Sequence, residues 1–203
     1  MAKKQNDRDI SNKYIVVSES EEWLQHPISQ KFCDEDFLRI VLFYVLHSPC
    51  KKSSYSRVNL EDYGWKNPWH KEKFKEIIDG KANFNEKSFR FTSAHKDFKT
   101  LWIETEKPDN FYDEISEEFA VFSHAGESNP HLDMLHHIRN SLAHGRFTVK
   151  KHNKEFYIFM EDVREVYNQL AVNARIVLKK KTLLNWIDIF ECKSEEAKKL
   201  CHD

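Results

Sequence analysis

The stretch NPHLDMLHHIRNSLAHGRFTVKKHNKEFYIFM, residues 129–160, carries the clearest structural signals in this chain of 203 residues. Asn129 and Pro130 form a cap-plus-proline pair of the kind that starts helices, and Gly145 is the residue type that most often ends one. Between them apolar residues recur at spacings of three and four: Leu132, Leu135, Ile138 and Leu142. The pattern predicts an amphipathic helix over residues 130–144.

Residues 146–160 follow this helix and predict a small β-hairpin, with strands at 146–151 and 155–160 around a His152-Asn153 turn. Most of the remaining chain has helical spacing. Further helices are expected from Asp34 or Asp36 to just before Pro49, and over residues 67–80, 93–102, 109–126, 162–177 and 183–190. The sequence therefore predicts a mainly α protein. Its parts are a polar N-terminal extension over residues 1–33, with a short strand near 14–17, and one helical domain over residues 34–203.

The composition limits the kinds of function. The formal net charge is −1, from 32 basic and 33 acidic residues, so any nucleic-acid contact must be a local site. The longest apolar run, residues 37–46, is half the length of roughly twenty residues that a membrane-spanning helix needs. The polar N-terminus is unlike a secretory signal. Four cysteines without a C-x-x-C pair indicate neither a zinc cage nor a disulfide framework: Cys33, Cys50, Cys192 and Cys201. We expect a cytoplasmic protein without a membrane span.

The polar side of the 130–144 helix has an unusual composition. It presents Asp133, His136, His137, Asn140 and His144, with Arg139 at the boundary to the apolar stripe. Such a set suits RNA cleavage by the 2′-hydroxyl, which needs a proton carrier near neutrality and a fixed cation for the phosphate. We expect His144 to move the proton, Arg139 to bind the phosphate, and Asn140, one turn before His144, to orient either group. This chemistry requires no metal or cofactor.

The residues Arg139-Asn140-Ser141-Leu142-Ala143-His144 resemble the R-x-x-x-x-H signature of the HEPN (higher eukaryotes and prokaryotes nucleotide-binding) family, with its preferred polar residue after the arginine. The following Gly145-Arg146-Phe147 and hairpin resemble the stand-alone HEPN proteins of bacterial defence and toxin systems. The resemblance implies a HEPN-like helical bundle and a homodimer with a composite active site. It also implies a metal-independent endoribonuclease that leaves a 2′,3′-cyclic phosphate, acts as a toxin or antiphage effector, and has an antitoxin or defence-system partner.

Two other pairs in the chain approach the same signature. Arg90 and His95 match its spacing, and Arg146 and His152 match it with one more intervening residue. Neither pair lies on an amphipathic helix with a polar residue after the arginine. Some toxins of the family also carry a modifiable tyrosine two residues after the histidine, where this chain has Arg146. Inhibition by modification at that position is therefore not expected.

Several alternatives remain beside this hypothesis. Arg139 and His144 would also suit the C-terminus of a helix simply by complementing its dipole. Asp133, His137 and His131 form a possible but incomplete metal-ligand set, and His136 and His137 have no assigned role. Tyr63, Trp65 and Trp69 are either base-stacking or core residues, and Lys179-Lys180-Lys181 is either a phosphate contact or a solvated turn. A catalytically silent dimeric binding module is the rival function.

Overall fold

The strands of this protein form a five-stranded mixed sheet, which a computed structural model describes for residues 10–17, 23–24, 32–50, 58–93, 97–107, 117–124 and 129–192. The strands are β1 (Phe89–Thr92), β2 (Phe119–Ser123), β3 (Phe147–His152), β4 (Glu155–Val166) and β5 (Gln169–Lys179). Their order is β1-β2-β5-β4-β3, with β1 and β2 parallel and every other pair antiparallel.

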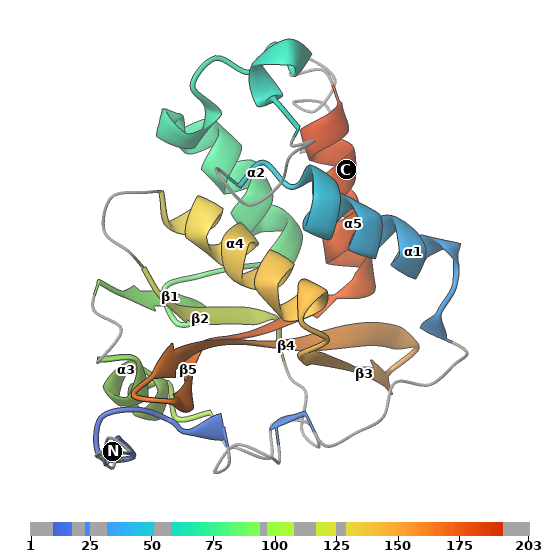
Figure 1. Cartoon of the computed structure of the whole chain (residues 1–203). Coiled ribbons are helices and arrows are strands. Elements are labelled where there is room, and N and C mark those ends of the chain that lie inside the picture. The colour runs from blue at the N-terminus through green and yellow to red at the C-terminus, as the bar shows by residue number, and fades with distance from the viewer. Residues whose placement is uncertain are drawn as a thin grey trace, which may run out of the picture.

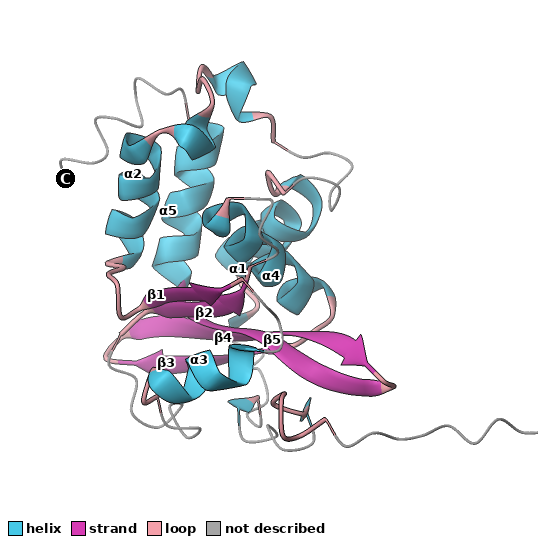
Figure 2. Ribbon diagram, turned by 90° about the vertical axis from the view of Figure 1, so that its left-hand side faces the viewer, coloured by secondary structure: helices cyan, strands magenta, loops and turns pink. Residues whose placement is uncertain are grey.

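The helices cover both faces of this sheet. One face carries α1 (Glu35–Leu42), α2 (Glu72–Ala82), α4 (Pro130–Ala143) and α5 (Lys180–Glu191), and the other carries α3 (Phe98–Glu104) (Figures 1 and 2). A π-helical turn, η4 (Phe43–His47), continues α1, and two 3₁₀ turns, η5 (Leu60–Tyr63) and η6 (Pro68–His70), precede α2. Within the described residues, no helix combines the length and the apolar character needed to cross a membrane.

Two hydrophobic cores lie on opposite faces of the sheet because neighbouring strand residues point in opposite directions. In β2, Ala120 and Phe122 join the core beneath the four helices, whereas Phe119 and Val121 join the core beneath α3. Trp23, from the N-terminal segment, is buried in this second core. Strand β2 is therefore buried on both faces.

The prediction of a mainly α helical bundle is wrong, since the fold is α/β. The expected helix over residues 162–177 is instead the end of β4, a turn, and most of β5. Within the expected helix over 109–126, residues 119–123 form β2, while 109–116 and 125–126 lie outside the described residues. A strand buried on both faces has apolar residues at nearly every position, so spacings of three and four occur in it by chance.

Other elements are confirmed. The helix expected over 130–144 is α4, and the hairpin expected over 146–160 is β3 with the first half of β4. This hairpin is the edge of the large sheet, however, and not a small appendage to helices. Asp34 caps α1 as expected, its side chain accepting a hydrogen bond from the backbone N–H of Phe37 at 3.0 Å. The four helices α1, α2, α4 and α5 thus pack on one face of the sheet.

Candidate functional site

Helix α4 brings the three predicted site residues to its C-terminal end. The side chain of Asn129 caps the start of the helix by accepting from the backbone N–H of His131 at 2.9 Å. Gly145 ends the helix in the left-handed conformation, with φ +66°. His144 is the C-cap residue, and its backbone N–H donates to the carbonyl oxygen of Asn140 at 3.0 Å. The site therefore depends on a helix whose two ends are both set by local sequence.

The guanidinium of Arg139 has only a neutral hydrogen-bond partner. Its Nη1 donates to Oδ1 of Asn140 at 3.1 Å, and its Nε is buried without an acceptor. Within the described residues no carboxylate forms an ion pair with it. Within the described residues, the positive charge of the half-buried Arg139 is therefore not balanced by a carboxylate, and one of its donors, on Nη1, contacts a neutral amide.

The other arginines of the described part have different partners. Arg90 pairs with Glu104 at 2.9 Å, Arg146 pairs with Glu161, and Arg164 lies over the Tyr14 ring. Arg39 and Arg175 also form ion pairs, with carboxylates of α5 and β4 respectively. The arginines of both competing R-to-H pairs therefore each contact a carboxylate, and His95 of one pair lies outside the described residues. Among the arginines that the structure describes, Arg139 and Arg164 have no carboxylate partner, and Arg139 is the one that belongs to the predicted motif.

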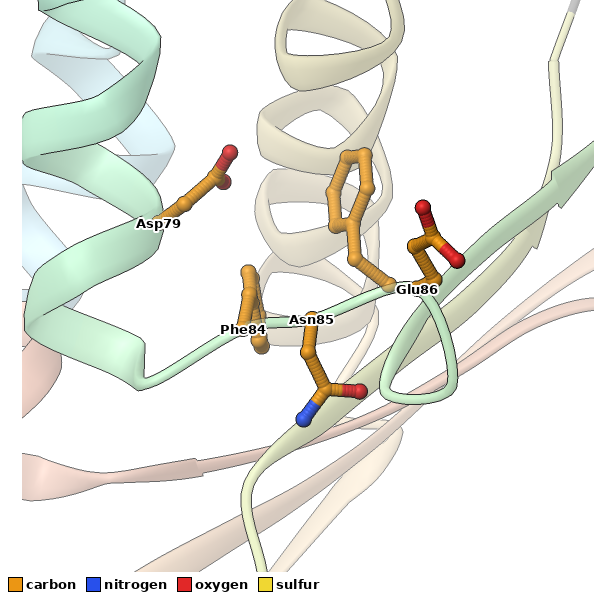
Figure 3. A pocket seen from close by; sticks show the side chains of 5 residues that line it. Asp79, Phe84, Asn85 and Glu86 are labelled. Carbon is orange, nitrogen blue, oxygen red and sulfur yellow. The ribbon is translucent and has the colours of Figure 1, made fainter.

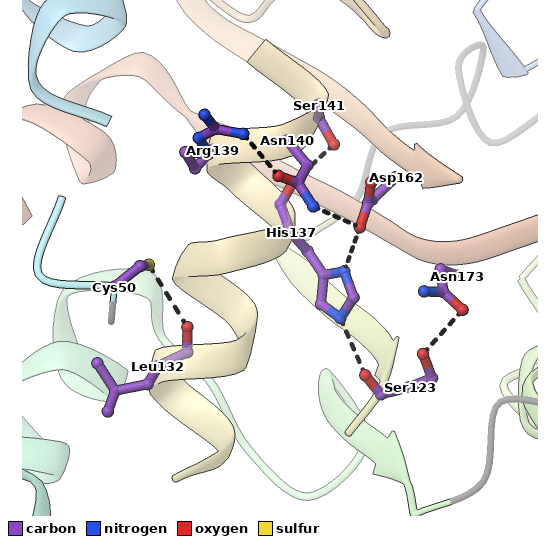
Figure 4. A network of polar contacts seen from close by, with 9 residues as sticks. All are labelled: Cys50, Ser123, Leu132, His137, Arg139, Asn140, Ser141, Asp162 and Asn173. Atoms are coloured by element: carbon purple, nitrogen blue, oxygen red, sulfur yellow. Dashed lines mark hydrogen bonds and ion pairs between the residues drawn. The ribbon is translucent and has the colours of Figure 1, made fainter. Parts of the chain in front are cut away.

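Asn140 connects Arg139 to a polar cluster beneath the helix (Figure 4). Its Nδ2 donates to Oδ2 of Asp162 on β4 at 3.3 Å. The same Oδ2 lies 2.6 Å from Nδ1 of His137. Asp162 thus receives two contacts from α4 and connects this helix to strand β4 of the sheet.

His137 is buried between two oxygen atoms. Its Nδ1 faces the Asp162 carboxylate, and its Nε2 lies 2.9 Å from the carbonyl oxygen of Ser123 at the end of β2. Carboxylate and carbonyl oxygens only accept hydrogen bonds, so the doubly protonated, cationic imidazole is the form that satisfies both contacts. Burial lowers the pKa of the neighbouring His136, and the charge of His137 lowers it further. The two adjacent histidines therefore have different environments.

The imidazole of His144 is not part of this cluster. His144 is exposed, and its side chain has no hydrogen-bond partner within the described residues. The structure therefore joins Arg139 and Asn140 directly and leaves His144 at the same helix end, open to solvent. Sequence reasoning missed Asp162, which it had placed at the start of a helix.

The possible metal-ligand set separates into three unrelated pairs. His131 Nε2 lies 2.8 Å from Asp79, Asp133 lies 2.7 Å from His124 Nδ1, and His137 binds Asp162. Histidine and carboxylate ligands must converge on one point to hold a metal. No group of three or more such side chains converges in this way within the described ranges.

The tryptophans and the lysine run that were candidate RNA contacts have other partners within the protein. Trp65 is buried, and Trp65 and Trp69 both pack edge-on against Phe74 in the core beneath the helices. Lys180 pairs with Asp34 at 2.8 Å and with Asp36 at 3.0 Å, holding the start of α5 to the start of α1. Neither group needs RNA to explain its position.

A separate pocket of about 280 Å³ lies near α2 and β1, with Asp79, Phe84, Asn85, Glu86 and Phe89 as its lining (Figure 3). Asp79 is the residue that holds His131, which belongs to the first turn of α4. This pocket therefore lies at the opposite end of α4 from Arg139 and includes none of the predicted site residues.

The candidate site is thus a guanidinium hydrogen-bonded to a neutral amide, the amide itself, and an exposed imidazole, all at one end of a helix. The fold is not the helical bundle that the motif implied, so these three groups, and not the fold, indicate the chemistry of the site. Comparison of the chain with protein-family models, with curated proteins and with solved structures gave no match.

Proposed function

We propose that this protein is an endoribonuclease that cleaves RNA by attack of the 2′-hydroxyl on the adjacent phosphate, without a metal ion. The observation that carries the proposal is that the half-buried Arg139 donates a hydrogen bond to a neutral amide. Arg90 and Arg146, the arginines of the two competing pairs, contact carboxylates instead. A guanidinium like that of Arg139 suits two parallel hydrogen bonds to phosphate oxygens. The exposed His144 at the same helix end suits proton transfer near neutral pH.

In this mechanism Arg139 binds the scissile phosphate and stabilises the charge that develops on its oxygens. A neutral His144 imidazole takes the proton of the 2′-hydroxyl as the 2′-oxygen bonds to phosphorus. The bond from phosphorus to the 5′-oxygen then breaks, and that oxygen takes a proton from an imidazolium or from water. The products are a 2′,3′-cyclic phosphate and a free 5′-hydroxyl. Asn140 holds the guanidinium through its Oδ1.

A homodimer would place two such helix ends across one RNA strand. Three leucines spaced four apart are exposed along α1 and η4: Leu38, Leu42 and Leu46. The core residues of η4 pack with those of α4, so this apolar stripe lies on an element adjoining the motif helix. We propose a second copy of the chain as its partner, with the two His144 imidazoles available as base and acid.

The biological setting is proposed from the motif alone. A ribonuclease of this kind fits a cytoplasmic toxin or antiphage effector restrained by an antitoxin or another defence component. Cys33, Cys50 and Cys192 form no disulfide bonds within the described residues, which is compatible with a reducing compartment.

The rival function is a silent dimeric module that binds RNA without cutting it. The specific observation in its favour is that no neighbour within the described residues holds the His144 imidazole in a fixed orientation. Such a module would still use Arg139 to bind phosphate, and it would bind RNA without producing new 3′ ends.

Incubation of purified protein with a mixed RNA pool in EDTA distinguishes the two functions. Cleavage with cyclic-phosphate ends should fall by roughly 10²–10³-fold in Arg139→Ala and by roughly 10²–10⁴-fold in His144→Ala. Arg90→Ala and His152→Ala are matched controls from the competing pairs and should cleave like the wild type. RNA binding without cleavage by a folded protein would establish the silent module, and full cleavage by Arg139→Ala would refute the role of Arg139 in either function.

A further inference from the structure

The amide of Asn140 has one chemically allowed orientation. Arg139 only donates hydrogen bonds, so the amide oxygen must face it at 3.1 Å. The Asp162 carboxylate only accepts, so the amide nitrogen must face it at 3.3 Å. Asp162 therefore decides which end of the amide is presented to Arg139.

A register shift between β4 and β5 helps to position the Asp162 side chain. Strands β4 and β5 shift register between Asp162 and Val163, where Asp162 pairs with Ala174 but Val163 pairs with Val172. Asn173, the extra residue that this shift leaves on β5, accepts a hydrogen bond from the Ser123 hydroxyl at 3.0 Å. Bulges of this kind redirect side chains and occur frequently beside functional sites.

The charge of Asp162 is balanced without using Arg139. His137 contacts the carboxylate at 2.6 Å, and both side chains are buried, with His137 5% and Asp162 5% exposed. The cationic imidazole is the form that satisfies its two oxygen neighbours. A buried ion pair is expensive to build into an apolar sheet and is weak evidence of a purely stabilising role. The pair orients the amide while leaving the charge of Arg139 uncancelled.

We propose that Asp162 and His137 are positioning residues for Arg139 and act through Asn140. This inference rests on the proposed function of Arg139 as the phosphate-binding residue. Asp162 fixes the amide, the amide fixes the guanidinium, and His137 fixes and neutralises Asp162. None of the three touches the RNA in this role.

The test compares Asp162→Asn with Asp133→Asn, a matched control in which another carboxylate beside a buried histidine loses its charge. The ligand is a single-stranded 2′-O-methyl RNA oligonucleotide, which cannot be cleaved, with its affinity measured by fluorescence anisotropy. We expect Asp162→Asn to weaken binding about tenfold, because misplacement of a binding group by about 1 Å has effects of this order or larger. In an Asn140→Ala background, Asp162→Asn should have no further effect, since residues acting as one unit are not additive.

Equal affinities of Asp162→Asn and Asp133→Asn would overturn the inference, as would a tenfold loss that persists in the Asn140→Ala background. A second measurement does not depend on RNA. The side-chain NMR signals of the Asn140 amide and the Arg139 guanidinium should shift in Asp162→Asn and not in Asp133→Asn.

If the wild type binds no oligonucleotide, the proposed function fails. The positioning role is then decided by NMR: shifted Asn140 and Arg139 signals in Asp162→Asn would support it, and unchanged signals would overturn it. If Asp162→Asn does not fold, His137→Gln replaces it. The inference then expects the loss in His137→Gln to vanish in the Asn140→Ala background, and additive losses would overturn it.

Discussion

Replacing Arg139 with methionine tests whether this arginine stabilises the fold or is retained for its function. Arg139 makes one hydrogen bond to a neutral amide and buries an Nε–H without an acceptor. The hydrogen bond is worth about 1 kcal/mol, and burying an unsatisfied donor costs about 1–3 kcal/mol. Methionine keeps much of the apolar stem and has no polar group to satisfy. We therefore expect the free energy of unfolding of Arg139→Met to lie within about 1 kcal/mol of the wild-type value or above it.

The same replacement at Arg175 should have the opposite effect. Arg175 is buried, binds Glu161 at 3.2 Å, and lies 4.8 and 4.7 Å from the ring centroids of Trp23 and Trp102. Removing one partner of a buried ion pair costs about 3–5 kcal/mol, because the other charge stays buried. Arg146 still binds Glu161, so the lower end of this range applies to Arg175→Met.

Urea unfolding followed by tryptophan fluorescence measures both variants. Arg39→Met is the control for an exposed arginine, whose pairs with Asp188 and Glu191 are worth at most about 1 kcal/mol each. A loss of more than about 2 kcal/mol in Arg139→Met, comparable to that in Arg175→Met, would show that Arg139 is needed for folding. The argument that its charge is held ready for a ligand would then be refuted.

Four further predictions concern titration, reactivity, assembly and salt. Burial raises the pKa of Glu118 above 4.5, so the folded state binds its proton more tightly than the unfolded state does, and stability falls as pH rises from 4.5. In urea unfolding between pH 4 and 7, the stability of the wild type relative to Glu118→Gln should therefore fall as pH rises. Burial raises the pKa of the Cys50 thiol to about 12, so iodoacetamide at pH 8 should label the exposed Cys33 and spare Cys50 until urea unfolds the protein, as peptide mass spectrometry would show. Leu42→Glu should shift sedimentation velocity from dimer to monomer, and a wild-type monomer would contradict the proposed interface. Finally, the plot of log affinity against log salt for single-stranded RNA should lose about 0.7 of its slope in Arg139→Ala for each phosphate contact removed, and an unchanged slope would exclude a phosphate contact.

The motif helix could be predicted because its signals are local. Asn129 and Pro130 start α4, Gly145 ends it, and the apolar stripe between them gives its buried face. The β3–β4 hairpin was equally local, since two alternating segments flank a short turn. Local signals of this kind do not depend on the rest of the fold.

The sheet could not be recognised in the same way. Strand β5 is buried on both faces over most of its length, so apolar residues occur at both even and odd positions along it, as at Ala171, Val172, Ile176 and Val177. The turn between β4 and β5 places Tyr167 and Asn168 at positive φ, as a two-residue hairpin requires, but without the glycine that usually marks such a turn. Apolar residues spaced three and four apart therefore indicated a helix that does not form.

Only the site residues that lie on helix α4 could be predicted from the sequence to lie together. Arg139, Asn140 and His144 share the end of α4, so their proximity follows from helical geometry. Asp162 lies 22 residues beyond Asn140, and its contact with the amide depends on the register of β4 and on the bulge beside it. No pattern within either segment shows that the two side chains meet.

The choice of asparagine at position 140 follows from the charges on either side. An aspartate there would hold Arg139 in place but would cancel the positive charge that phosphate binding needs. It would also face the Asp162 carboxylate across the present 3.3 Å contact, where two negative groups repel each other. A neutral amide avoids both effects, because its oxygen serves the guanidinium and its nitrogen serves the carboxylate. Asn140 can therefore pass orientation from Asp162 to Arg139 without passing charge, which makes Asn140→Asp a more damaging change than its size suggests.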